Sequence, residues 1–99
     1  MLEIKLDEKR FTDFIESLVM RRFKTSKEIE ELIYNKTDIK VKLFYDEQYN
    51  EIERLEGYDY CLKSNVTIND TDLCYLDVYF IRDNGGQFYI TEVSTDFNT

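Results

Sequence analysis

The stretch that decides the fold is residues 72–97, which read DLCYLDVYFIRDNGGQFYITEVSTDF. Both halves are rich in β-branched and aromatic residues, which suit a pleated strand surface. Between them an Asn-Gly pair tolerates the positive φ angles of a two-residue hairpin turn. The sequence therefore predicts strands over 72–82 and 87–96 that form a hairpin turning at Asn84-Gly85.

This turn would place Asp77 opposite Glu92 and Tyr79 opposite Ile90. Alternation along the strands then sorts the side chains onto two faces. The predicted core face carries Leu76, Val78, Phe80, Tyr89, Thr91 and Val93. The predicted outer face carries Tyr75, Asp77, Tyr79, Glu92, Ser94 and Asp96.

The outer face is a candidate binding surface. Facing carboxylates cost stability unless solvent or a cationic partner relieves them. Carboxylates suit Arg and Lys of a partner, and tyrosine rings supply contact area at low entropic cost. The alternative left open is a solvated, charged face that only keeps the protein in solution.

Two amphipathic helices are predicted before the strands. Asp7 can cap the first helix, and Thr25 with Glu28 fits a capping box for the second. A tight turn would join them. The apolar stripes at helical spacing are Phe11, Phe14, Ile15, Leu18, Val19 and Phe23 in the first helix and Ile29, Leu32 and Ile33 in the second.

Shorter patterns complete the predicted fold. Leu2, Ile4 and Leu6 alternate as in a short edge strand, and a second alternating run predicts a strand near 38–45. Helical spacing predicts a short helix near 47–56, and residues 58–68 read as another strand. We expect a single α+β domain over 1–99, with the two helices packed on an antiparallel sheet of about four strands.

Composition narrows the chemistry. The chain has no histidine, which excludes Ser-His, Cys-His and zinc-His mechanisms. Cys61 and Cys74 are expected to be free thiols in the core. Asp77 and Glu92 resemble the paired acids of metal-dependent nucleases, but Ser94 stands where that pattern has lysine. We therefore expect no catalytic, cofactor or metal site; a carboxylate-metal enzyme is the second alternative.

The acidity is confined to the predicted sheet. Residues 1–42 hold ten Lys and Arg against nine Asp and Glu, a net of +1, whereas residues 43–99 hold three against twelve, a net of -9. Direct nucleic-acid binding needs a basic footprint and is not expected, but an acidic surface can occupy the basic groove of a nucleic-acid enzyme. The chain shows no membrane span or secretion signal, which predicts the cytoplasm of a bacterial cell.

Residues 77–97, about a quarter of the chain, resemble the acidic hairpin of some small phage-encoded anti-CRISPR proteins that inhibit Cas9. Small size, acidity and lack of alanine are also similar to that group, which shares no single fold. The resemblance implies an inhibitor that binds a CRISPR effector or another nucleic-acid enzyme, with Asp77, Asp83, Glu92 and Asp96 at the matching positions. An antitoxin, immunity protein or regulatory module of a low-GC bacterium or plasmid is the alternative, and a homo-oligomer remains open.

Overall fold

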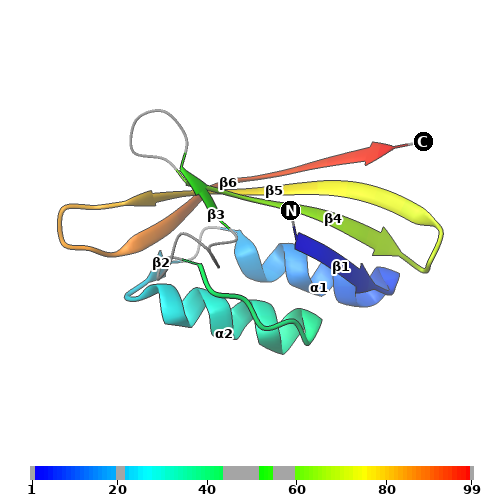
Figure 1. Ribbon diagram of the computed structural model, residues 1–99, viewed down its shortest axis with the longest axis horizontal. Coiled ribbons are helices and arrows are strands. Elements are labelled where there is room, and N and C mark those ends of the chain that lie inside the picture. Colours follow the sequence, from blue (N-terminus) through cyan, green and yellow to red (C-terminus); the bar gives the residue numbers. More distant parts are fainter. Residues whose placement is uncertain (1, 20–21, 44–51, 55–59, 99) are drawn as a thin grey trace.

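The chain adopts an α+β fold, as predicted, with two helices on one side of a single sheet (Figure 1). The computed structural model describes residues 2–19, 22–43, 52–54 and 60–98. The helices are α1 (Glu8–Leu18) and α2 (Ser26–Thr37). The strands are β1 (Leu2–Leu6), β2 (Arg22–Phe23), β3 (Ile52–Arg54), β4 (Tyr60–Ile68), β5 (Asp72–Arg82) and β6 (Phe88–Asn98).

The sheet is mixed and has six strands in the described residues, so the expected antiparallel sheet of about four strands is corrected. Its order is β1-β4-β5-β6-β2, and β3 pairs with β4 beyond the end of β1. Strand β1 runs parallel to β4, from Leu2 beside Ser64 to Leu6 beside Ile68, whereas the other pairs are antiparallel. The apolar residues of β1 become buried when β1 joins the edge of β4. The sheet thereby gains a strand that is distant in sequence from β4.

The core forms where the helices meet the sheet. Phe11, Phe14 and Leu18 of α1 are buried, as are Ile29 and Ile33 of α2, which confirms most of the two predicted stripes. On the sheet side the largest fully buried residues are Ile4, Leu62, Val66, Leu76, Val78 and Phe80. Burial of these side chains is the main force that holds the layers together.

The connection between the helices differs from the predicted tight turn. Helix α1 ends at Leu18, and Val19 is extended and 52% exposed instead of continuing the apolar face. Phe23 is buried, but it lies in the two-residue strand β2, where it pairs with Phe88 of β6. Helical spacing alone could not separate a longer helix from a helix followed by a short strand, because Phe23 reaches the core either way.

Two further predictions over 38–56 are wrong within the described residues. Residues 38–43 contain no strand beyond an isolated bridge at Lys42, although Val41 and Leu43 are buried as the alternation suggested. Residues 52–54, expected in a short helix, form β3 against β4. Tertiary pairing with β4 has overridden a weak helical pattern there. The rest of these two predicted elements, 44–51 and 55–56, lies outside the described residues.

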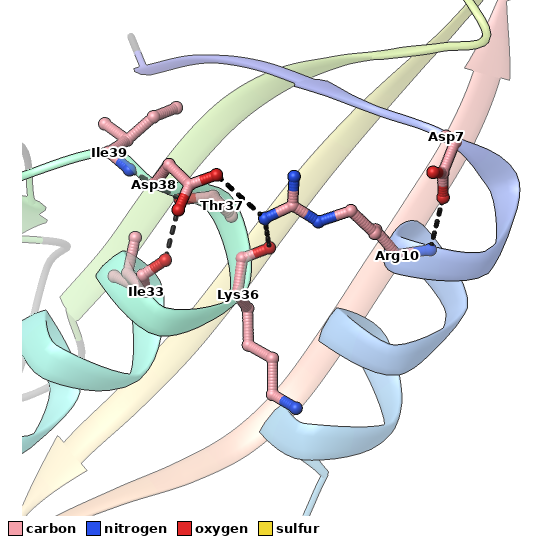
Figure 2. A network of polar contacts seen from close by, with 7 residues as sticks. All are labelled: Asp7, Arg10, Ile33, Lys36, Thr37, Asp38 and Ile39. Carbon is pink, nitrogen blue, oxygen red and sulfur yellow. Dashed lines mark hydrogen bonds and ion pairs between the residues drawn. The ribbon is translucent and has the colours of Figure 1, made fainter.

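A polar network ties the start of α1 to the end of α2 (Figure 2). The side chain of Arg10 donates from Nη2 to the carboxylate of Asp38 at 3.0 Å and to the carbonyl oxygen of Lys36 at 3.2 Å. Asp38 ends α2 in the left-handed conformation, with φ 63°. At the start of α1, Asp7 caps the helix as predicted, because its carboxylate accepts from the Arg10 backbone N–H at 2.7 Å. Arg10 thus links the start of α1 to the end of α2.

Candidate protein-binding face

Both described helices lie on the same side of the sheet, so its other side is a surface that no described helix covers (Figure 1). We call this surface the open face. Strand alternation and register place side chains from β1, β4, β5 and β6 on it. Its polar residues and tyrosines include Glu3, Lys5, Lys63, Asn65, Thr67, Tyr75, Asp77, Tyr79, Glu92, Ser94 and Asp96. Leu73 and the buried Cys61 lie on the same side, across from Thr67 and Tyr79.

A β-bulge at Thr91 determines how β6 contributes to the open face. Phe80 pairs with Ile90 and Tyr79 pairs with Glu92, so Thr91 has no partner on β5. Its hydroxyl donates to the Tyr79 carbonyl at 3.3 Å. The extra residue reverses the alternation of β6, because Phe88 and Ile90 point into the core before it and Val93 packs on the core after it.

The turn loop, which is one residue longer than predicted, and the bulge each shift the pairing by one residue, and together they correct the predicted faces and register. Tyr89 and Thr91 do not belong to the core face, since Tyr89 is half-buried beside Ile81 and Thr91 is exposed. Val93 does pack on the core, as predicted. The open-face pairs are Tyr75 with Asp96, Asp77 with Ser94, and Tyr79 with Glu92. The expected pairs of Asp77 with Glu92 and of Tyr79 with Ile90 are therefore wrong.

The structure brings five of the six predicted site residues together, namely Tyr75, Asp77, Tyr79, Glu92 and Asp96. Asp77 lies opposite Ser94, midway between Glu92 and Asp96, so the three carboxylates form a triangle. Diagonal neighbours of this kind are about 7–8 Å apart. Tyr79 lies directly across from Glu92, and Tyr75 lies directly across from Asp96. Tyr75 is 38% exposed.

The charges are unevenly distributed over the open face. Asp77 is half-buried and has Lys63 of β4 across from it on the other side. Glu92 and Asp96 are exposed and belong to a strand, Phe88–Asn98, that contains no lysine or arginine. A cationic cross-strand neighbour therefore relieves Asp77 but not the two acids of β6, whose field extends into solvent.

The face around Tyr79 disfavours further negative charge. The pKa of the Tyr79 phenol is raised, first because a thiolate at neighbouring Cys61 would repel the phenolate, then by partial burial and by Asp77 and Glu92. Tyr79 therefore stays a neutral hydrogen-bond donor beside the carboxylates. Such a phenol supplies contact area without adding to the repulsion among the acids.

The β4 side of the open face was missing from the predicted site. Lys63 and Asn65 lie on it, and the Asn65 amide donates to the carboxylate of Glu3 at 3.1 Å, which joins β4 to β1. A partial signal for these residues existed in the sequence, because Lys63, Asn65 and Thr67 alternate with apolar Leu62, Val66 and Ile68, although polar Ser64 interrupts the pattern. The face thus changes from mixed charge at β1 and β4 to purely acidic at β6.

The sixth predicted residue, Asp83, lies apart from the others at the hairpin turn. Its carboxylate accepts from the Gln87 N–H at 2.9 Å and from the Tyr89 hydroxyl at 3.0 Å. The pKa of Asp83 is lowered, mainly by the Gln87 N–H, with Tyr89, the Gly85 N–H and Arg22 adding to it. The guanidinium of Arg22 lies 4.3 Å from the centre of the Tyr89 ring. Asp83 thus organises the turn.

The turn itself keeps its predicted place but not its predicted backbone. Asn84 and Gly85 are its central residues, and the Gly86 N–H donates to the Asp83 carbonyl at 3.0 Å. The left-handed residue is Gly86, with φ 84°, instead of the Asn-Gly pair. The hairpin loop therefore contains one more residue than predicted, which is a common three-residue arrangement.

Within the described ranges, no group of three or more Cys, Asp or Glu side chains could hold a metal ion. Cys61 and Cys74 are buried and are not joined in a disulfide, and burial is the main cause of the raised pKa of the Cys74 thiol. Neither described helix is long and apolar enough to cross a membrane. Comparison with protein-family models, with curated proteins and with solved structures found no match.

Proposed function

We propose that this chain is a small inhibitor that binds the basic, nucleic-acid-binding surface of an enzyme through the acidic part of its open face. A CRISPR effector of the Cas9 type is the enzyme class we put forward. The observation that carries the proposal is the pairing of exposed acids on β6 with tyrosines on β5, Glu92 with Tyr79 and Asp96 with Tyr75.

A phosphate-binding groove presents Arg and Lys in a row and is attracted by any surface of opposite sign. Glu92 and Asp96 are four positions apart on one strand, and Asp77 lies between them on the next. Four residues of strand span about 13–14 Å, so the acids can meet several cations of one groove at once. The neighbouring tyrosines then add contact area at little cost in side-chain entropy.

The test is DNA cleavage by a Cas9–guide RNA complex in the presence of increasing amounts of the protein. Inhibition should occur when the protein is added before target DNA and should weaken when DNA is bound first, because both compete for one basic surface. The double variant Glu92→Lys/Asp96→Lys should lose inhibition.

A matched control carries the same change of charge on the helix side. Asp13 and Glu16 are exposed on α1, so Asp13→Lys/Glu16→Lys changes the net charge equally without touching the open face. This control should inhibit like the wild type. Unaltered cleavage at saturating protein, or equal loss of inhibition in both double variants, contradicts the proposal.

A further inference from the structure

Among the described residues, strand β6 is paired on its outer edge only at its start. Only its first two residues, Phe88 and Tyr89, pair with β2, and no strand in the described part of the chain pairs with the same edge beyond them. In Figure 1 this part of β6 forms the upper margin of the sheet and runs toward the C-terminus. Glu92, Thr95 and Asp96 are exposed there. An edge of this kind presents a row of backbone donors and acceptors to any extended chain.

The usual protections of an edge strand are few in this protein. The chain has 0 prolines, and β6 contains no lysine. The bulge at Thr91 can disrupt pairing at one end only, because from Glu92 to Asn98 the register with β5 is regular. Residues 92–97 are therefore a continuous stretch of edge on which a strand can be added.

Charge argues against a second copy of the chain at this edge. Paired strands bring side chains of the same face together, so Glu92, Ser94 and Asp96 of one copy would meet the same three residues of the other. Every such register sets acid against acid or against a hydroxyl group, and never against a base. Like charges that face each other destabilise a pair, so the acids disfavour self-pairing and favour a basic strand.

We propose that an extended segment of the partner protein adds to the edge of β6 over residues 92–97, with Lys or Arg at every second position and apolar residues between them. The inference rests on the proposed function and specifies how the partner engages. The basic side chains would lie beside Glu92 and Asp96 on the open face.

The apolar side chains of the added segment would lie on the helix side of the sheet. Phe97 belongs to that side, is 50% exposed and touches Phe11 of α1, with ring centroids 6.2 Å apart. An apolar residue of the segment would cover the exposed part of this ring. The edge thus offers both halves of the alternating pattern, acids on one face and an aromatic ring on the other.

The probes are three synthetic peptides of about six residues, the common length of a strand. One alternates lysine with valine; the second has the same sequence with all of its backbone nitrogens methylated; the third has the same composition in two blocks. Each binding constant is measured with the full chain. Because methylation removes backbone hydrogen bonds and leaves the charge unchanged, the methylated peptide should bind at least about tenfold more weakly. The block peptide should also bind more weakly.

Amide hydrogen exchange then locates the contact. Every second amide over 92–97 should become protected when the alternating peptide is bound, since only those N–H groups point to the free edge. Equal affinity for the alternating and methylated peptides overturns the inference, and so does protection of amides elsewhere with none on β6. Association of the protein with itself that the alternating peptide reverses would show that a second copy occupies the edge, and this also overturns the inference.

The two proposals fail in different experiments. Cleavage that the protein does not inhibit, together with a peptide that protects β6, refutes the proposed enzyme partner and leaves strand addition supported. Inhibited cleavage together with equal binding of the alternating and methylated peptides refutes strand addition and leaves the inhibitor proposal supported.

Discussion

Glu92 of β6 lies directly across from Tyr79 of β5, and this relationship exists because Thr91 forms a bulge between them and the turn. The same bulge puts Asp77 across from Ser94, with Lys63 on its other side. The acids of the open face therefore differ in their surroundings. Their contributions to stability and to binding can be separated by experiment.

Neutralising Glu92 should affect association, whereas neutralising Asp77 should affect folding. Glu92→Gln removes an exposed charge and should slow association with the partner, most clearly at low salt, since exposed charges are screened beyond roughly 8 Å at physiological ionic strength. Asp77→Asn removes the charge opposite Lys63 and should cost about 0.2–1 kcal/mol of stability. Stopped-flow rates over a salt series and urea unfolding measure the two effects. Salt-independent association of the wild type would refute the electrostatic role.

Phe14 should be among the most costly residues to truncate. Its side chain is 1% exposed between α1 and the sheet, so Phe14→Ala should lower the free energy of unfolding by about 3–5 kcal/mol. Val19→Ala is the control, because Val19 is 52% exposed and should change the stability by less than about 0.5 kcal/mol. Denaturant titration of both variants measures the difference, and a similar cost for the two would remove Phe14 from the core.

Gly86 should resist substitution more than its neighbour Gly85. Gly86 has φ 84°, so alanine there adopts a left-handed conformation that costs about 1–2 kcal/mol. A Cβ atom at Gly85 would lie 3.4 Å from the Asp83 carboxylate, which is ordinary contact, and that residue has no positive φ. Thermal unfolding of Gly86→Ala and Gly85→Ala should therefore show a larger loss for Gly86→Ala. The reverse order would contradict the three-residue loop.

Asp38 offers a test of the helix junction. With φ 63° it favours glycine, yet its carboxylate also binds Arg10 at 3.0 Å. Asp38→Ala loses the ion pair and keeps the strained backbone, whereas Asp38→Gly loses the ion pair and relieves the strain. Unfolding experiments should find Asp38→Ala less stable than Asp38→Gly by about 1 kcal/mol. Equal stability would show that the left-handed conformation is not retained in the variants.

Asp83 should make the stability depend on acidic pH. The pKa of Asp83 in the folded chain is lower than its ordinary value of 3.8, mainly because of the Gln87 N–H. The ionised carboxylate therefore stabilises the fold above about pH 3.8, and this contribution disappears as the pH falls through the folded-state pKa. Asp83→Asn should weaken the pH dependence, and Tyr89→Phe should raise the pKa of Asp83 in an NMR titration. A titration midpoint at or above 3.8 in the wild type would contradict the hydrogen bonding at the turn.

Several parts of the fold were predictable because local physics decides them. Phe11, Phe14 and Leu18 recur at helical spacing and form one apolar helix face, and this pattern is local in sequence. Helix α1 forms at the predicted place. The strand predicted over 72–82 coincides with β5. Its β-branched and aromatic residues favour a strand, and β5 pairs with β4 on one side and with β6 on the other. The outer-face residues of β5 were therefore identified correctly from alternation.

Pairings between distant segments were not predictable in the same way. The sequence of Leu2–Leu6 does not indicate that the strand runs parallel to β4. The spacing of 52–54 favoured a helix, but these residues form a strand that pairs with β4. The bulge at Thr91 leaves no clear mark in the sequence, yet one inserted residue changes every cross-strand neighbour beyond it.

The sequence by itself determined two amphipathic helices, a C-terminal hairpin and an excess of acid in the sheet half, because periodicity, turn residues and charge are local properties. The tertiary structure alone decided which acids lie beside tyrosines, that Lys63 lies opposite Asp77, and that no described strand pairs with the outer edge of residues 92–97. The physical reason is that register and edge position depend on which strands bury apolar surface against one another, and that is settled only when the whole core assembles.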